Sequence, residues 1–386
     1  MEYFLTEEQQ MIKDLARKIA DEKVAPRALE LDESGEFPWD IMKILAESDL
    51  FGVYLPEEYG GLGGGVFEQV LVVEELSRAC SGVAVSYAAS GLGAGPIMVL
   101  GSEEQKQKYL TQIASGKKLA AFAATEANAG SDPSGMETTA VLDGDEYVLN
   151  GTKQWITNGG EAEIYTVMAV TDKKKGPRGI SCFIVEKGTP GFTFGKKENK
   201  MGIRASATRE LVFDNCRIPK ENLLGGKEGI GFIATMRTFD RTRPGIGAQA
   251  LGIAQGALDA AVKYSRERYQ FGQAISAFQA IQHMMADMAT QIEAARALVY
   301  ATAKMIDAGA KNFSKESAMA KLFASDVAMK VTVDAVQIFG GYGYMKEYPV
   351  EKMMRDAKIT QIYEGTNQIQ RNIIALELIK EFASKK

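Results

Sequence analysis

Hydrophobic and polar positions in the first third of the chain repeat with the period of an α-helix. Thr6 and Gln9 have the spacing of a helix capping box. The apolar positions that share one face of the helix after it are Ile12, Leu15, Ala16 and Ile19. Similar patterns predict helices over 38–49, 66–80 and 103–115, with glycine-rich breaks at 59–65 and 90–96. We therefore expect an N-terminal α-helical domain over residues 1–118.

Near residue 118 the pattern changes to short β-prone runs that are separated by turns. The turn pairs Asp143-Gly144 and Asn150-Gly151 are typical of hairpins. The β-prone runs cover residues 146–149, 164–171, 180–185 and 210–213. Because no long crossover helix separates them, antiparallel pairing in a compact barrel or sandwich is favoured over a parallel sheet. A middle β domain is expected over residues 119–227.

The helical period then returns in longer runs. These runs cover 228–240, 245–272, 279–308, 314–339 and 367–383, and Pro244 is expected to separate the first two. Long amphipathic helices that lie side by side predict a bundle resembling a four-helix bundle over residues 228–386. The fold class predicted for the whole chain is α+β multidomain, in the order helical, β, helical.

Composition narrows the range of partners. The 386 residues include 45 basic and 50 acidic residues, a net charge of −5, and the two signs are interspersed. This balance argues against a nucleic-acid partner or a polybasic membrane patch. Cys80, Cys182 and Cys216 lie far apart without a CxxC pair, so neither a disulfide framework nor a zinc cluster is encoded. The only histidine, His283, excludes a His-ligated metal centre and is expected on a helix face.

The N-terminal segment "MEYFLTEEQQMIKDLARKIA" carries acidic residues and has no continuous apolar core. It does not resemble a signal peptide, and we expect a cytoplasmic protein. We also expect no membrane insertion, because no run of about 18 apolar residues is recognised anywhere in the chain.

Several motifs carry chemistry, each beside a structural alternative. "YGGLGGG" (59–65) lies between predicted helices, not after a strand, so it is not a dinucleotide fingerprint. The small residues of "FAATEANAGSDPSG" (122–135) would let a phosphate or flat ring approach the backbone, although a simple turn before a strand explains them as well. Trp155 in "GTKQWITNGG" could wall a planar cofactor or belong to the core.

In "FDRTRPGIG" (239–247), Asp240 and Arg243 have the i,i+3 spacing of a helix salt bridge. The alternative is that this pair recognises a polar ligand. "QIYEGTNQIQRN" (361–372) places the carboxylate of Glu364 on a bend where an extended segment gives way to a helix.

Together these stretches resemble the acyl-CoA dehydrogenase family, flavoenzymes that oxidise acyl-CoA thioesters to 2-enoyl-CoA. The similarity covers nearly the whole chain. The segments that carry it are "PEEYGGLGG", "TEANAGSD", "GTKQWITNG", "FDRTRP", "RERYQFG" and "QIFGGYGYMKEYPVEKMMRDAKITQIYEGTNQIQRN". The resemblance implies bound FAD, an acyl-CoA substrate, an electron-transfer flavoprotein as electron acceptor, and a homotetramer or dimer of dimers built from the C-terminal bundles.

The resemblance also assigns site residues. The isoalloxazine and ribityl chain would be surrounded by Phe122, Ala124, Thr125, Gly130, Ser131, Trp155, Ile156 and Thr157. The FAD pyrophosphate and adenosine would be held across a subunit boundary by Arg268, Gln270, Phe271, Gln279, Gln337 and Gly341. The start of the last helix would add Thr366 and Gln368. The thioester substrate would meet Ser131, Asp240, Arg243, Tyr363, Glu364 and Gly365.

In the family the glutamate of "YEGT", here Glu364, removes the C2 proton, and the flavin N5 accepts a hydride from C3. The family pattern also implies that the Glu364 backbone N–H and a ribityl hydroxyl hydrogen-bond the thioester carbonyl. Desolvation should raise the pKa of Glu364 toward the roughly 6 to 7 that suits a general base. Metal ligands are not expected.

The acyl group is less defined. The family's acyl pocket is partly floored by the segment 86–96, whose small residues are Ala88, Ala89, Gly91, Ala94 and Gly95. They suggest room for a branched, cyclic or aryl-bearing acyl group, and a short straight chain stays an alternative. Other readings are an enoyl-CoA reductase that runs the reaction in reverse, a non-catalytic scaffold that binds CoA esters and, less favoured because of the chain length, an oxidase.

Overall fold

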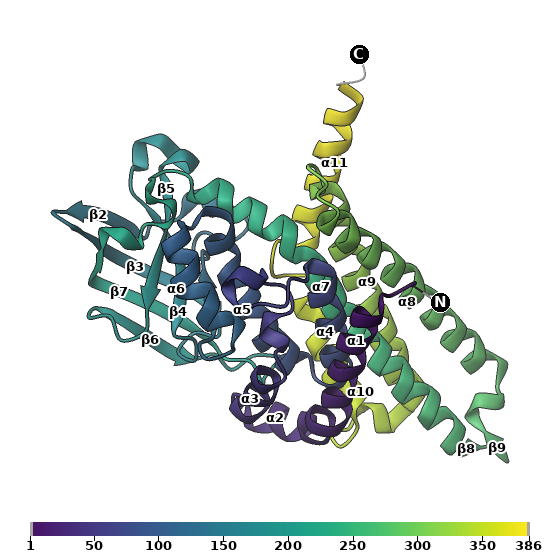
Figure 1. Ribbon diagram of the computed structural model, residues 1–386. Helices are drawn as coiled ribbons and strands as arrows, with labels where there is room; N and C mark the ends of the chain where they lie inside the picture. Colours follow the sequence, from purple (N-terminus) through teal and green to yellow (C-terminus); the bar gives the residue numbers. More distant parts are fainter. Residues whose placement is uncertain (1–2, 384–386) are drawn as a thin grey trace.

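The computed structural model describes residues 3–383 and arranges them as helices, then a sheet, then long helices (Figure 1). This order confirms the predicted fold class. The N-terminal helices lie between the sheet and the long C-terminal helices. They are α1 (Glu7–Ile19), α2 (Ala28–Ser34), α3 (Trp39–Glu47), α4 (Val66–Ala79), α5 (Ser81–Leu100) and α6 (Glu103–Ala114).

The predicted capping box is confirmed at the start of α1. The Thr6 side chain accepts from the Gln9 backbone N–H at 3.2 Å, and the Gln9 side chain accepts from the Thr6 N–H at 3.1 Å. Two backbone donors that a helix start leaves without partners are thereby satisfied.

The glycine-rich break expected at 90–96 is wrong, because α5 continues through it to Leu100. The glycines there serve close packing instead of chain reversal. A Cβ at Gly93 would lie 2.7 Å from the Ala121 backbone nitrogen, which no real side chain could tolerate. Burial against β1 and α4 thus outweighs the modest cost of glycine in a helix.

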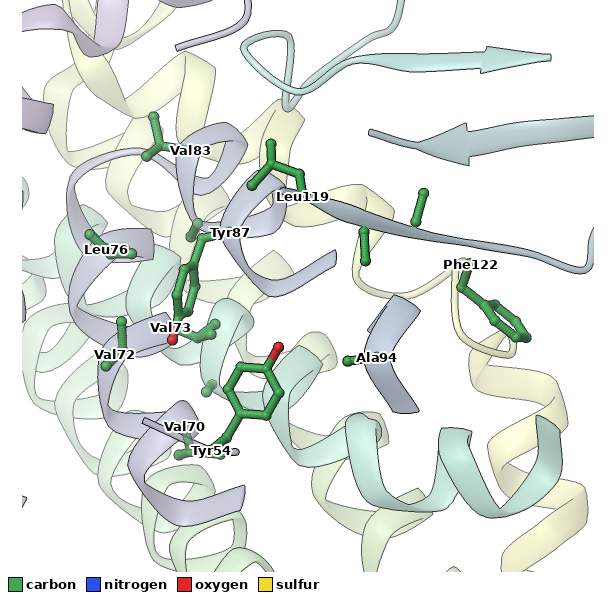
Figure 2. Close-up of a cluster of buried hydrophobic side chains, with 14 of the residues drawn as sticks. Tyr54, Val70, Val72, Val73, Leu76, Val83, Tyr87, Ala94, Leu119 and Phe122 are labelled. Atoms are coloured by element: carbon green, nitrogen blue, oxygen red, sulfur yellow. The ribbon is translucent and has the colours of Figure 1, made fainter. Parts of the chain in front are cut away.

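By its length and the composition of its most apolar 18-residue window, α5 is also the one helix among residues 3–383 that could cross a membrane. The expectation that no such stretch exists is therefore wrong. Since 72% of that window is buried inside the protein, α5 has the position of a core helix. Figure 2 shows its residues Val83, Tyr87 and Ala94 among buried side chains of neighbouring elements.

The middle segment forms one seven-stranded sheet with the order β1-β4-β2-β3-β7-β6, and β5 pairs with β4. Its strands are β1 (Ala120–Ala123), β2 (Thr139–Asp143), β3 (Glu146–Thr157), β4 (Ile164–Val170), β5 (Ile180–Glu186), β6 (Phe192–Lys197) and β7 (Thr208–Pro219). Most ladders are antiparallel, as predicted. The exceptions are β1 with β4, and a single residue pair between β2 and β4, which are parallel.

The C-terminal part contains long helices and a small hairpin. The helices are α7 (Gly231–Glu267), α8 (Gln279–Asp307), α9 (Ser314–Phe339), α10 (Pro349–Ile359) and α11 (Asn367–Ala383), and the hairpin pairs β8 (Tyr269–Gln270) with β9 (Gln273–Ala274). In Figure 1, α7 runs from the sheet into this bundle, and α11 projects from it. The segment before Glu364 was expected to be extended, but α10 makes it helical up to Ile359.

The helix break expected at Pro244 is also wrong, since α7 is continuous from Gly231 to Glu267. Proline cannot donate to the carbonyl four residues earlier, which here belongs to Asp240. Ser317 of α9 supplies the missing donor, with its hydroxyl 2.6 Å from the Asp240 carbonyl oxygen. A partner 77 residues away thus satisfies the group that the proline leaves open.

Candidate active site

A two-residue corner between α10 and α11 carries the Glu364 side chain. Glu364 and Gly365 both have left-handed backbone conformations, with φ values of 49° and 91°. Glutamate in this region is uncommon, so neighbouring groups must hold the corner. Gln370 donates to the Glu364 carbonyl at 3.2 Å and to the Gly365 carbonyl at 2.9 Å, and Lys321 donates to the same Gly365 carbonyl at 2.8 Å.

The Glu364 carboxylate reaches α7, where its Oε2 accepts from the Thr242 hydroxyl at 2.7 Å. The residue as a whole is half-buried, and desolvation of its carboxyl group raises the pKa of Glu364. The Thr242 hydrogen bond and the positive charges of Arg243 and Lys321 oppose that rise. The arrangement is therefore a proton acceptor with an increased affinity for the proton.

Asp240 and Arg243 form the i,i+3 ion pair that the sequence offered as one reading. Arg243 is buried, its Nη1 donates to the Asp240 carboxylate, and its Nε has no hydrogen-bond partner among the residues described. The Ser314 hydroxyl also donates to this carboxylate. Burial lowers the pKa of Arg243, while the charges of Asp240 and Glu364 oppose that shift. Because the unpartnered Nε is itself buried, the structure shows the ion pair, and recognition of a polar ligand by this pair stays a prediction.

A cavity of about 240 Å³ lies among α4, α5 and α7 and includes Thr242, the residue that bonds Glu364. Two hydroxyls that line it, from Tyr54 and Thr238, are buried and have no hydrogen-bond partner among the described residues. Figure 2 shows the Tyr54 hydroxyl pointing toward the helix that carries Ala94. The full lining is Tyr54, Val66, Gln69, Gly91, Gly95, Met98, Val99, Thr238, Arg241 and Thr242.

The small residues of α5 do not all face this cavity. Gly91 and Gly95 line it, whereas Ala94 is fully buried in the core. A Cβ at Gly91 would overlap the Gln69 amide nitrogen, and one at Gly95 would lie 2.5 Å from the Thr238 methyl group. Side chains of α4 and α7 thus occupy much of the space that these glycines leave.

A second, larger cavity of about 620 Å³ lies at the end of the long helices. It brings together four residues predicted for the cofactor: Arg268, Gln270, Phe271 and Gly341. The other two of that group, Gln279 and Gln337, are exposed but do not line it. Phe271 is 93% exposed, so the described residues leave it open to solvent.

The loop that contains Gly130 and Ser131 is tied to β3 by a buried ion pair. Lys153 Nζ lies 2.7 Å from Glu126 Oε1, and the Glu126 carboxylate accepts the backbone N–H groups of Glu137 and Thr138 at 2.6 and 3.0 Å. One carboxylate therefore joins both ends of the loop, while Gly130 and Ser131 themselves are exposed.

Beside this loop, a bulge in β3 gives Trp155 a φ of 58° and leaves its side chain 57% exposed. The core reading of this tryptophan is thus wrong. Phe122 packs edge-on against Phe239 of α7, with 5.5 Å between ring centroids. Of the remaining predicted neighbours, Ala124 and Ile156 are buried, and Thr125 and Thr157 are half-buried.

At the start of α11, the Thr366 hydroxyl accepts from the Ile369 N–H at 3.3 Å, and Gln368 is exposed. The Tyr363 hydroxyl donates to the Gln249 side chain and so points into the protein. Sequence reasoning missed Thr242, Lys321 and Gln370. Thr242 lies within a motif that was recognised, whereas Lys321 had no local signal.

Comparison with known proteins gives consistent matches. The chain matches the N-terminal, middle and C-terminal domains of acyl-CoA dehydrogenases over residues 6–117, 121–216 and 229–379. Acryloyl-CoA reductase (NADH) from Anaerotignum propionicum is 51% identical over 382 residues, which cover 98% of this chain and 96% of the relative.

Two solved structures are also similar. Butyryl-CoA dehydrogenase from Megasphaera elsdenii is 50% identical with a TM-score of 0.95, covering 98% of this chain and 100% of that one. A chain in a structure that concerns the electron transferring flavoprotein of Acidaminococcus fermentans and flavin-based electron bifurcation is 56% identical with a TM-score of 0.96. That match covers 98% of this chain and 99% of the other.

Proposed function

The chain belongs to the acyl-CoA dehydrogenase family, and from this premise we propose that it oxidises a short-chain acyl-CoA thioester to the 2-enoyl thioester with Glu364 as the base. The observation that carries the proposal is the desolvated Glu364 carboxylate, which is joined through Thr242 to a cavity beside it. A carboxyl group whose pKa is raised by burial suits proton abstraction near neutrality.

Members of this family are flavoproteins that use FAD, and the residues present fit that cofactor. Arg268 offers a guanidinium to the larger cavity, and a Cβ at Gly341 would meet nothing within 4 Å, so the backbone there is open to a ligand. The exposed Trp155 offers an aromatic face beside the tethered loop. When bound, FAD supplies a hydride acceptor for the substrate C3.

The protein's own groups would remove the C2 proton and stabilise the charge that develops on the thioester carbonyl. The corner directs the Glu364 carboxylate, which takes the C2 proton, and Thr242 holds one of its oxygens. As negative charge develops on the thioester carbonyl, the Glu364 backbone N–H would hydrogen-bond it, as the family pattern implies. Gly365 lets the chain turn beside that carbonyl without a side chain.

A short acyl chain is favoured by the size and polarity of the smaller cavity. Its volume of about 240 Å³ lies below the roughly 300 to 1,000 Å³ of most ligand pockets. A long hydrocarbon chain would also strip water from the hydroxyls of Tyr54 and Thr238, which have no protein partner among the described residues. Because Gln69 and Thr238 occupy the space beside Gly91 and Gly95, support for a bulky acyl group is weaker than the sequence suggested.

The reverse reaction is a second candidate, because a relative 51% identical to this chain is named acryloyl-CoA reductase (NADH). The same site residues serve both directions, and electron supply decides between them. An electron-transfer flavoprotein is the proposed electron partner, supported by the solved structure that concerns such a protein. A homotetramer is proposed from family resemblance.

Anaerobic titration of the purified holoenzyme with acyl-CoA thioesters tests the proposal. Butyryl-CoA should bleach the flavin absorbance more efficiently than isobutyryl-, cyclohexanoyl- or phenylpropionyl-CoA. Glu364→Gln should retain FAD and bind the thioester, yet lose nearly all flavin reduction. A variant that bleached at the parental rate would remove Glu364 from its role, and a colourless protein that takes up no FAD would favour the scaffold.

The direction is tested by following crotonyl-CoA and acryloyl-CoA with chemically reduced enzyme. Reoxidation by these enoyl thioesters that is much faster than reduction by their saturated counterparts would favour the reductase. Comparable rates in the two directions would leave the dehydrogenase proposal in place.

A further inference from the structure

Helix α9 presents a stripe of polar side chains to the protein interior. Ser314, Ser317, Lys321 and Ser325 follow each other at helical spacing, and the last three are fully buried. Core-facing positions of this kind usually hold apolar residues, and lysine is among the residues least often buried. The stripe therefore needs polar partners.

Its partners are the two segments that carry the proposed active site. Ser314 and Ser317 donate to the carboxylate and the carbonyl of Asp240 on α7. Lys321 donates to the Gly365 carbonyl at 2.8 Å and to the Asn367 side chain at 2.9 Å. One face of α9 thus holds α7 and the Glu364 corner in register with each other.

Lys321 is the charged member of this stripe. Burial lowers the pKa of Lys321 to about 7, with Glu364 and Asp326 opposing the shift and Arg243 adding to it. On α11, Arg371 pairs with Asp326 at 3.1 Å, which reduces the influence of that carboxylate. The Lys321 amine is therefore mostly protonated below pH 7, where its positive charge favours the ionised form of Glu364.

We propose that Lys321 is a positioning residue for Glu364, because it holds the Gly365 carbonyl and so fixes the left-handed corner. Its positive charge also opposes the rise in the pKa of the Glu364 carboxyl group. The inference rests on the proposed role of Glu364 as the base. Gln370 also donates to the Gly365 carbonyl, so the corner keeps one side-chain donor when Lys321 is replaced.

The test uses Lys321→Met, which removes charge and donors, and Lys321→Gln, which keeps a polar head. The matched control is Lys330→Met, because Lys330 lies on the same helix but is exposed and forms its ion pair with Asp334, at 3.2 Å, away from the corner. Flavin reduction by butyryl-CoA is followed by stopped flow across the pH range, normalised to bound FAD, and thermal midpoints are recorded.

In Lys321→Met, the acidic limb of the pH–rate profile for flavin reduction should move up by about one pH unit. One nearby opposite charge lowers a carboxyl pKa by about 1 to 3 units, so this is the lower end of the expected range. The limiting rate should fall about 10- to 100-fold, because a misplaced base is costly. Lys321→Gln should show the same shift with a smaller loss of rate. Lys330→Met should match the parent in both. If the acidic limb of both Lys321 variants lies at the same pH as in the parent, the proposal is overturned.

Infrared titration supplies a readout that does not need turnover. The carboxylic acid band that disappears in Glu364→Gln should persist to higher pH in Lys321→Met holoenzyme than in the parent. If butyryl-CoA and the other thioesters fail to reduce the parent, the proposed function fails. If the parent is active but this band and the limb are unmoved, only the role of Lys321 fails.

Discussion

Replacing Thr242 by valine should raise the pKa of the Glu364 carboxyl group, the proposed base, and leave the shape of the smaller cavity nearly unchanged. The threonine hydroxyl donates to Glu364 Oε2 at 2.7 Å in a part-buried setting. A hydrogen bond to a charged group contributes about 1.5 to 3 kcal/mol. One pKa unit corresponds to about 1.4 kcal/mol. Loss of the bond should therefore raise the pKa of Glu364 and move the acidic limb of the pH–rate profile by about 1 to 2 pH units.

The direction follows from the form of Glu364 that is stabilised. Thr242 donates to the ionised carboxylate and lowers its pKa, so its removal adds to the increase that burial already causes. The acidic limb of flavin reduction should move to higher pH, and the limiting rate above it should change much less. The position of the acidic limb can be resolved by stopped-flow measurement of flavin reduction with butyryl-CoA at about eight pH values between about pH 5.5 and 9.

Thr235→Val is the matched control. Thr235 is buried on the same helix and donates to the Gly231 carbonyl at 3.0 Å, away from Glu364. This variant should keep the parental limb. If Thr242→Val has parental FAD content and its acidic limb stays at the parental pH or moves to lower pH, the Thr242 hydrogen bond does not stabilise the ionised carboxylate and the reasoning is refuted.

Three further changes test the packing around the site. Gln69→Ala should enlarge the smaller cavity, which is the proposed site of the acyl group, and raise the ratio of hexanoyl-CoA to butyryl-CoA kcat/KM by about 10-fold, measured with an artificial electron acceptor. Glu126→Gln should lower the free energy of unfolding by about 3 kcal/mol, because it leaves Lys153 buried without a counter-ion, and adding Lys153→Met should recover part of that loss in denaturant titrations. Gly93→Ala should lower the thermal midpoint, since its Cβ would meet the Ala121 backbone nitrogen at 2.7 Å.

Local patterns were sufficient for much of the fold. The capping box of Thr6 and Gln9 marked the start of α1, and the periodicity of the chain gave the order of helices, strands and helices. These features depend on neighbours within a few residues, so they can be recognised from the sequence.

The errors arose where a distant partner outweighs a local preference. Pro244 is a helix breaker by itself, yet α7 continues because Ser317 donates to the Asp240 carbonyl that the proline leaves free. Gly93 weakens a helix by itself, yet α5 continues because only a residue without a side chain fits against β1. Neither partner lies within the short stretch of sequence over which a hydrophobic pattern can be recognised.

The same distinction separates the parts of the site. Glu364 could be singled out because its motif resembles that of a family, whereas Lys321 lies 44 residues from the Gly365 carbonyl that it binds. What does distinguish Lys321 is its place on the interior face of α9, together with Ser317 and Ser325. A polar residue on a face that should be apolar costs free energy unless a specific partner compensates for it. A stripe of polar residues on the interior face of a helix therefore indicates that the helix holds a distant backbone segment, even before that segment has been identified.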